Sequence, residues 1–136
     1  VVLDPNPPFD GGAGRLSVNE DDPVSGVVTQ PTFTGVPTNG SPVYLELDYR
    51  TEVNLRVGLL AFDIQGNVLP MTTLVLRPSE SWNKTYFSLA EPLNEVVVNG
   101  IAFKIVLSAE LPSTNEGFTI SEGTALVDNV KLIYFL

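Results

Sequence analysis

Hydrophobic and polar positions alternate with a period of two along most of the chain. The clearest case is the segment 43–50, in which the odd positions are apolar and positions 46, 48 and 50 are charged. Successive side chains of a strand point to opposite faces of a sheet, so this pattern predicts a strand that is buried on one face. Similar segments predict roughly eight to nine strands at the turn spacings typical of β-sandwiches. They are residues 15–18, 26–33, 53–63, 71–76, 82–89, 101–109 and 124–135, with a short further candidate at 118–120.

The connections between these segments also favour an all-β fold. Gln65-Gly66-Asn67 and Asn99-Gly100 are turn signals. No helical pattern of about 10–15 residues separates the strands, which argues against a parallel sheet with crossover helices. We therefore predict a two-sheet antiparallel β-sandwich.

The length of 136 residues is near the commonest size of a single domain. Residues 1–8 are rich in proline and are predicted to form an extended tether, which leaves residues 9–136 as one sandwich domain. No apolar stretch approaches the ~20 residues that cross a bilayer, and the N-terminus does not resemble a signal peptide.

The charge and the missing residue types exclude several function classes. Seven Lys and Arg against 16 Asp and Glu give a net charge of -9, which repels phosphate backbones, so we expect no nucleic-acid partner. The chain has no cysteine and no histidine, which removes disulfides, Ser-His and Cys-His catalysis and the usual zinc and iron ligands. The Gly-x-Ser-x-Gly motif is also absent. We expect a protein that is not an enzyme.

Asp128 is the most unusual residue of the pattern. It shares its parity with Leu126, Val130, Leu132 and Tyr134, so it is predicted to lie on an apolar face. A buried carboxylate without a partner costs several kcal/mol. One interpretation is a structural calcium ion, because calcium binds six to eight oxygens. The other interpretation is that Asp128 accepts hydrogen bonds from backbone amides or from Arg15. The co-ligands predicted for calcium are Glu20, Asp22 and the turn at Asp10.

Three aromatic residues are candidate ligand-binding residues. Trp82 and Tyr86 lie four positions apart with the same outward parity, and Tyr44 is predicted on an outer face as well. Flat rings on a rigid sheet can stack on the apolar faces of sugars. The alternative is that Trp82 closes one end of the sandwich. Leu60 and Phe62 also point outward, and they either cover the core or form a patch for another subunit or domain.

Three segments together resemble the jelly-roll ectodomains of Bacteroidetes surface lipoproteins: residues 42–50, 81–86 and 127–132. More distantly, Asp128-Asn129-Val130 is similar to the end of the last strand in jelly-roll carbohydrate-binding modules. These resemblances imply a jelly-roll, galactose-binding-like topology and a calcium ion at Asp128. They also imply a location at the cell surface or outer membrane of a Gram-negative bacterium, with a signal peptide and a lipidated cysteine before Val1.

Two function classes follow. The first is a non-catalytic extracytoplasmic binding module, with carbohydrate as the first ligand class to test. The alternative is a structural or assembly module that binds other proteins at the cell surface. Either would contact the membrane only through an N-terminal lipid anchor. A hydrolase is a third class, and it would need a cleft with two converging carboxylates.

Overall fold

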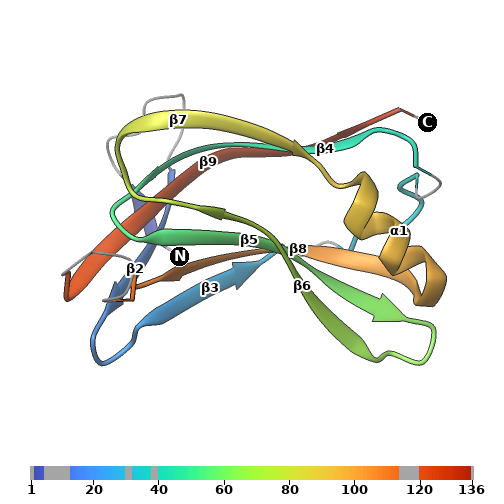
Figure 1. Ribbon diagram of the computed structural model, residues 1–136, viewed down its shortest axis with the longest axis horizontal. Helices are drawn as coiled ribbons and strands as arrows, with labels where there is room; N and C mark the ends of the chain where they lie inside the picture. Colours follow the sequence, from blue (N-terminus) through green and yellow to red (C-terminus); the bar gives the residue numbers. More distant parts are fainter. Residues whose placement is uncertain (1, 5–12, 30–31, 38–39, 114–119, 136) are drawn as a thin grey trace.

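The computed structural model describes residues 2–4, 13–29, 32–37, 40–113 and 120–135. Within these residues the chain forms nine strands and one helix (Figure 1). In chain order they are β1 (Val2–Asp4), β2 (Ala13–Asn19), β3 (Val24–Val28), β4 (Val43–Thr51), β5 (Asn54–Asp63), β6 (Val68–Leu76), β7 (Ser79–Ser88), α1 (Ala90–Asn99), β8 (Gly100–Glu110) and β9 (Glu122–Tyr134).

The strands form two antiparallel sheets that pack face to face. One sheet has the order β1-β2-β9-β4-β7 and the other has the order β3-β8-β5-β6. Figure 1 shows β4, β7 and β9 along the top of the view, with β3, β5, β6 and β8 below them. The prediction of an all-β, two-sheet antiparallel sandwich is confirmed.

The core lies between the sheets and is filled by the alternating rows that the sequence predicted. Most odd positions of β4 and β5 are buried, as are Phe103, Ile105 and Ala109 of β8. Members of this core include Val43, Leu45 and Leu47; Leu55, Val57 and Leu59; and Phe103, Ile105 and Ala109. Leu60 and Phe62 face outward from β5 and are half-buried. Among the described residues, no helix is long and apolar enough to cross a membrane.

The helix α1 was not expected from the sequence. It begins at Ala90 within Ser88-Leu89-Ala90-Glu91, whose Ser-x-x-Glu spacing is typical of a helix N-terminus, and the Ala90 amide donates a hydrogen bond of 3.2 Å to Ser88 Oγ. Leu93 is fully buried and packs α1 against the core. The prediction of a turn at Asn99-Gly100 was wrong, because α1 ends at Asn99 and β8 begins at Gly100.

A bulge in β9 moves Asp128 to a different face from the one predicted. Lys131 pairs with Glu46 and Asp128 pairs with Asp48, so the two residues at 129 and 130 lie opposite a single residue of β4. Asn129 has a φ of 50°, in the left-handed region that asparagine tolerates. Residues before the bulge therefore keep one parity and residues after it take the other. Asp128 points away from the core, whereas Leu132 and Tyr134 pack against it.

Several predicted boundaries differ from the structure. Val2–Asp4 pair with β2 as an edge strand, so this part of the predicted tether belongs to the five-stranded sheet. The rest of the tether and most of the candidate strand at 118–120 lie outside the described residues. The strand predicted at 26–33 ends at Val28, and Phe33 forms an isolated bridge with Phe103.

Candidate functional site

One broad surface carries the three aromatic residues that the sequence singled out. We call it the outer face: the side chains of β7, β4, β9 and β2 that point away from the core. On β2, β4 and β9 they alternate with core residues, and on β7 Tyr86 precedes the core residue Phe87. They include Trp82, Lys84 and Tyr86 on β7; Tyr44, Glu46, Asp48 and Arg50 on β4; Leu126, Asp128, Lys131 and Ile133 on β9; and Arg15 and Ser17 on β2.

Tyr44 and Tyr86 form an aromatic pair at one end of the outer face. Their ring centroids are 6.5 Å apart and the rings meet edge to face at 73°. The exposed fraction is 70% for Tyr86 and 38% for Tyr44. Ile133 lies directly across from Tyr44 on β9 and is also exposed. These three side chains form a solvent-exposed apolar surface at this end of the outer face.

An ion pair occupies the middle of the outer face. Lys84 Nζ donates a hydrogen bond of 2.8 Å to Glu46 Oε1. This hydrogen bond lowers the pKa of the Glu46 carboxyl below its ordinary value of 4.5, and the charges of Lys84 and Lys131 act in the same direction. The same hydrogen bond raises the pKa of the Lys84 ammonium, and the negative charge of Asp48 raises it further.

The Glu46–Lys84 pair gives a pH-dependent prediction. The pKa of Glu46 is lowered in the folded state, so its contribution to stability is present at neutral pH and is lost as the pH falls through that pKa. In an NMR titration of the carboxyl carbons, the Glu46 midpoint should lie below 4.5. Lys84→Gln should raise it toward that value. Lys104→Gln, which changes the same charge on β8, should leave it in place, and a shift of equal size there would contradict the assignment.

Asp48 and Asp128 face each other across β4 and β9 beside this ion pair. They are direct cross-strand partners, and Asp48 is only 3% exposed. Asn129 joins them, because its amide Nδ2 donates to Asp48 Oδ2 at 2.9 Å and its backbone N donates to Asp128 Oδ1 at 2.8 Å. The interpretation that Asp128 accepts a backbone hydrogen bond is thus confirmed for one oxygen. The other, Oδ2, is buried and has no hydrogen-bond partner among the described residues.

The structure does not bring the predicted calcium ligands together. Asn19, which precedes Glu20 and Asp22, pairs with Glu122 at one end of β9, whereas Asp128 follows Val127 near the other end of the β2–β9 pairing. Six residues of strand span about 20 Å. Asp10 lies outside the described residues, and no group of three acidic side chains within them could hold a metal ion. Calcium at Asp128 stays a prediction, with Asp48 as the neighbouring carboxylate.

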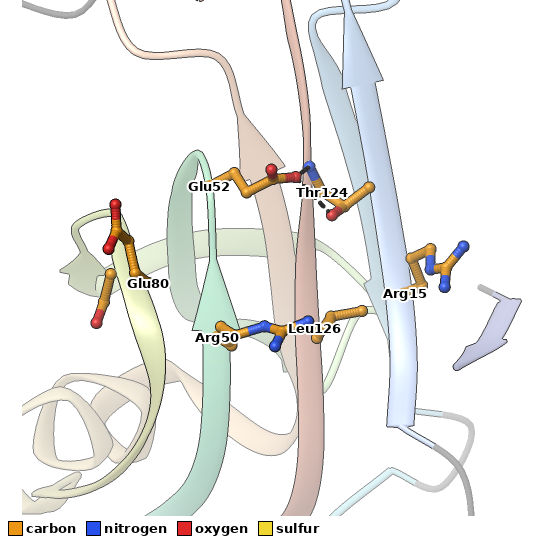
Figure 2. A pocket seen from close by; sticks show the side chains of 7 residues that line it. Arg15, Arg50, Glu52, Glu80, Thr124 and Leu126 are labelled. Atoms are coloured by element: carbon orange, nitrogen blue, oxygen red, sulfur yellow. Dashed lines mark hydrogen bonds between the residues drawn. The ribbon is translucent and has the colours of Figure 1, made fainter. Parts of the chain in front are cut away.

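A pocket of about 490 Å³ opens at the other end of the outer face (Figure 2). Its lining residues come from β2, β4, β7, β9 and the turn between β4 and β5: Arg15, Arg50, Glu52, Ser79, Glu80, Thr124 and Leu126. Arg50 pairs with Leu126, and Leu126 pairs in turn with Arg15, so the three form a row across the sheet. Figure 2 shows the Arg50 side chain extending toward Leu126. Leu126 is 4% exposed and makes an apolar floor.

Trp82 connects this pocket to the rest of the outer face. It is half-buried, and Arg50 Cζ lies 5.8 Å from the centre of its ring, a cation–π distance. Trp82 therefore does not fill the interior of the sandwich. Along β7, Trp82 lies between the pocket residue Glu80 and Tyr86.

The charged groups of the outer face are not arranged like a hydrolase site. Ser81-Trp82-Asn83-Lys84 has the Ser-x-x-Lys spacing, but residues three apart on a strand point to opposite faces, and Lys84 is bonded to Glu46. Asp48 and Asp128 are neighbours, as retaining glycosidases require of their two carboxylates. Asp48, however, is buried and bonded to Asn129. The described pair therefore does not present two carboxylates to a substrate.

Several solved structures are similar to this chain in fold. A family 30 carbohydrate-binding module of a cellulosomal cellulase of Clostridium thermocellum matches with a TM-score of 0.65 and 16% identity, over 98% of this chain and 81% of the module. A second family 30 carbohydrate-binding module matches with a TM-score of 0.63 and 14% identity, over 98% and 83% of the two chains. The domain has a jelly-roll fold.

A third structure belongs to a much larger protein. The enzymatically active domain of tailspike protein 4 of bacteriophage CBA120 matches with a TM-score of 0.66 and 15% identity, over 96% of this chain but only 16% of the tailspike chain. At these identities the likeness concerns the fold. No family model matches the sequence, and no curated protein matches it.

The sequence pointed to part of this surface only. Trp82, Tyr86 and Tyr44 were found from their parity, and all three lie on the outer face. Arg50 was overlooked, because an arginine at the exposed position of an alternating strand is an ordinary observation. What distinguishes Arg50 is its position opposite Leu126, and this position depends on the pairing of β4 with β9, which are far apart in the chain.

Proposed function

We propose that this domain is a non-catalytic carbohydrate-binding module that works outside the cytoplasm. The observation that carries the proposal is the set of aromatic rings on the outer face of one sheet: the exposed Tyr86 and the half-buried Trp82 on β7, and Tyr44 beside Tyr86 on β4. Aromatic rings held by a rigid scaffold supply stacking surface at low entropic cost. Two similar structures are carbohydrate-binding modules by name, which supports the same ligand class.

The spacing of these rings suits an extended oligosaccharide. Trp82 and Tyr86 are four residues apart on one strand, a distance of about 13 Å. Lys84 lies between them and is paired with Glu46, which lies opposite Tyr86 on β4; both charged groups can exchange hydrogen bonds with hydroxyls. A glycan lying along β7 and β4 would stack at its two ends and form polar contacts in the middle. The extracytoplasmic location rests on the resemblance of residues 42–50, 81–86 and 127–132 to surface lipoproteins.

The experiment is a glycan array followed by calorimetry on the ligands that bind. Trp82→Ala and Tyr86→Ala should each weaken binding by about tenfold or more, since a buried aromatic contact at a binding surface is worth over 1 kcal/mol. The control is Leu69→Ala, which truncates an exposed apolar side chain on β6 of the other sheet, since Leu69 is 56% exposed. It should bind like the unaltered protein. All three variants should keep the unaltered thermal unfolding temperature.

A silent array would contradict the proposal, as would full binding by Trp82→Ala. The other candidate function is then an assembly module that binds proteins. One observation favours it: three apolar side chains at the β5–β6 hairpin, Ile64, Val68 and Leu69, are exposed. In that case Leu69→Ala should disrupt association in sedimentation experiments, and Trp82→Ala should not.

A further inference from the structure

Among the described residues Arg50 has no acidic partner, although acidic residues are abundant in the chain. The chain has 16 Asp and Glu for seven Lys and Arg, and both Lys84 and Arg56 form ion pairs. Within the part of the chain that the structure describes, Arg50 forms neither an ion pair nor a hydrogen bond, and its one interaction is with the ring of Trp82. A guanidinium that stacks on a ring keeps the N–H donors of its edge available.

The surroundings of Arg50 form a pocket that fits a sugar ring. Leu126 makes the apolar floor, and the hydroxyls of Ser79 and Thr124 also line the pocket. Arg15 lies on the far side of Leu126 from Arg50, two strand spacings or about 10 Å away. Both arginines thus line the pocket, and Figure 2 shows the Arg50 guanidinium directed toward Leu126. Planar, bidentate donors of this kind are suited to carboxylate and phosphate groups.

Two glutamates restrict which anion can enter. Glu52 Oε1 accepts hydrogen bonds from the backbone N and the Oγ1 of Thr124, at 2.9 and 2.8 Å, and Glu80 is exposed at the edge of the pocket. A densely charged anion such as a polyphosphate would be repelled by both carboxylates. A neutral sugar would leave Arg50 without a counter-charge. A sugar ring with one carboxylate and several hydroxyls suits both kinds of group. Its carboxylate can pair with Arg50, and its hydroxyls can donate hydrogen bonds to the glutamates.

We propose that this pocket binds the carboxylate of a uronic acid residue, which makes acidic glycans the ligand class of the outer face. The inference rests on the proposed function, because the pocket adjoins Trp82 on the same surface. Arg50 binds the carboxylate, Arg15 adds positive charge on the opposite side, and Leu126 contacts the apolar face of the ring.

The test compares oligosaccharides of galacturonate, glucuronate and mannuronate with the same oligosaccharides after reduction of their carboxyl groups to alcohols. Calorimetry should show that at least one acidic form binds about tenfold more tightly than its neutral counterpart. Arg50→Gln should bring this ratio close to one, and Arg50→Lys should restore it only in part, because lysine lacks the bidentate edge. Raising the salt concentration should lower the ratio as well.

Lys104→Gln is the matched control, since it removes one positive charge from β8 of the other sheet. It should keep the preference of the unaltered protein for the acidic form. Equal binding of acidic and reduced forms would overturn the inference and leave the proposed function standing. A preference that survives Arg50→Gln would overturn it too, because the carboxylate would then bind elsewhere. If neither form binds and the wider array is silent, the proposed function fails as well.

Discussion

Gly58→Ala is expected to destabilise the domain by about 3 kcal/mol, as a lowered midpoint in urea denaturation. Gly58 lies on β5 where its pairing with β6 shifts by one residue. A Cβ at this position would overlap the carbonyl oxygen of Met71 and would lie 3.3 Å from Thr72 Cα. These are backbone atoms of the neighbouring strand, so no side-chain rotation can relieve the contact.

Gly26→Ala is the control for this prediction. Gly26 also lies in a strand, but a Cβ there would have its nearest neighbour, Leu107 O, at 3.4 Å, an ordinary contact. Its effect should stay within about 0.5 kcal/mol. If the two variants lose the same amount of stability, the close approach of β6 at Met71 is not the reason why position 58 is a glycine.

Asp128→Asn is expected to stabilise the domain by about 2 kcal/mol at neutral pH, since a buried acceptor without a partner costs about this much and acidic residues directly opposite each other on adjacent strands are unfavourable. The asparagine keeps the oxygen that accepts from the Asn129 amide. It replaces the buried oxygen that lacks a partner with an N–H donor beside Asp48. Thermal unfolding in a metal-free buffer measures the change. Glu122→Gln is the control, because it makes the same charge change at an exposed position of β9, and it should have little effect.

The same variant tests the calcium prediction. If Asp128 and Asp48 hold a calcium ion, the unaltered protein should melt at a higher temperature with calcium than with a chelator. Asp128→Asn would then lower the melting temperature in calcium instead of raising it. If the melting temperature does not respond to calcium and Asp128→Asn is more stable, then Asp48 and Asp128 do not form a calcium site. Their proximity is then simply unfavourable.

The fold was predictable to the extent that burial follows parity. The rows of β4, β5 and β8 were found because each strand is covered on one face by the opposite sheet. α1 was missed, although Ser88 and Glu91 have the spacing of a capping box, because the signal is a local one inside a β-rich chain. The bulge at Asn129 could not be foreseen, since one extra residue in β9 is visible only against its partner β4.

The candidate site was predictable in its aromatic residues and not in its charged ones. Trp82 and Tyr86 needed only the parity of a single strand. Asp48 looks like an ordinary solvent-facing residue in the pattern of β4, yet it is buried, with Lys84 and Asp128 as its neighbours on the two adjacent strands. Such cross-strand neighbours depend on the order of the strands in the sheet, and the periodicity of a single segment does not reveal that order.

The position of β9 has a consequence for how the protein is made. β9 is the last of the described strands in the chain, yet it lies in the interior of the five-stranded sheet between β2 and β4. During synthesis β2 and β4 must leave the ribosome with that place vacant, and their pairing sites stay open until the last strand emerges. Such late, long-range closure is slow and leaves strand edges exposed to other chains. The surface that carries Tyr44, Arg50 and Leu126 is therefore completed only when translation of this domain is nearly finished.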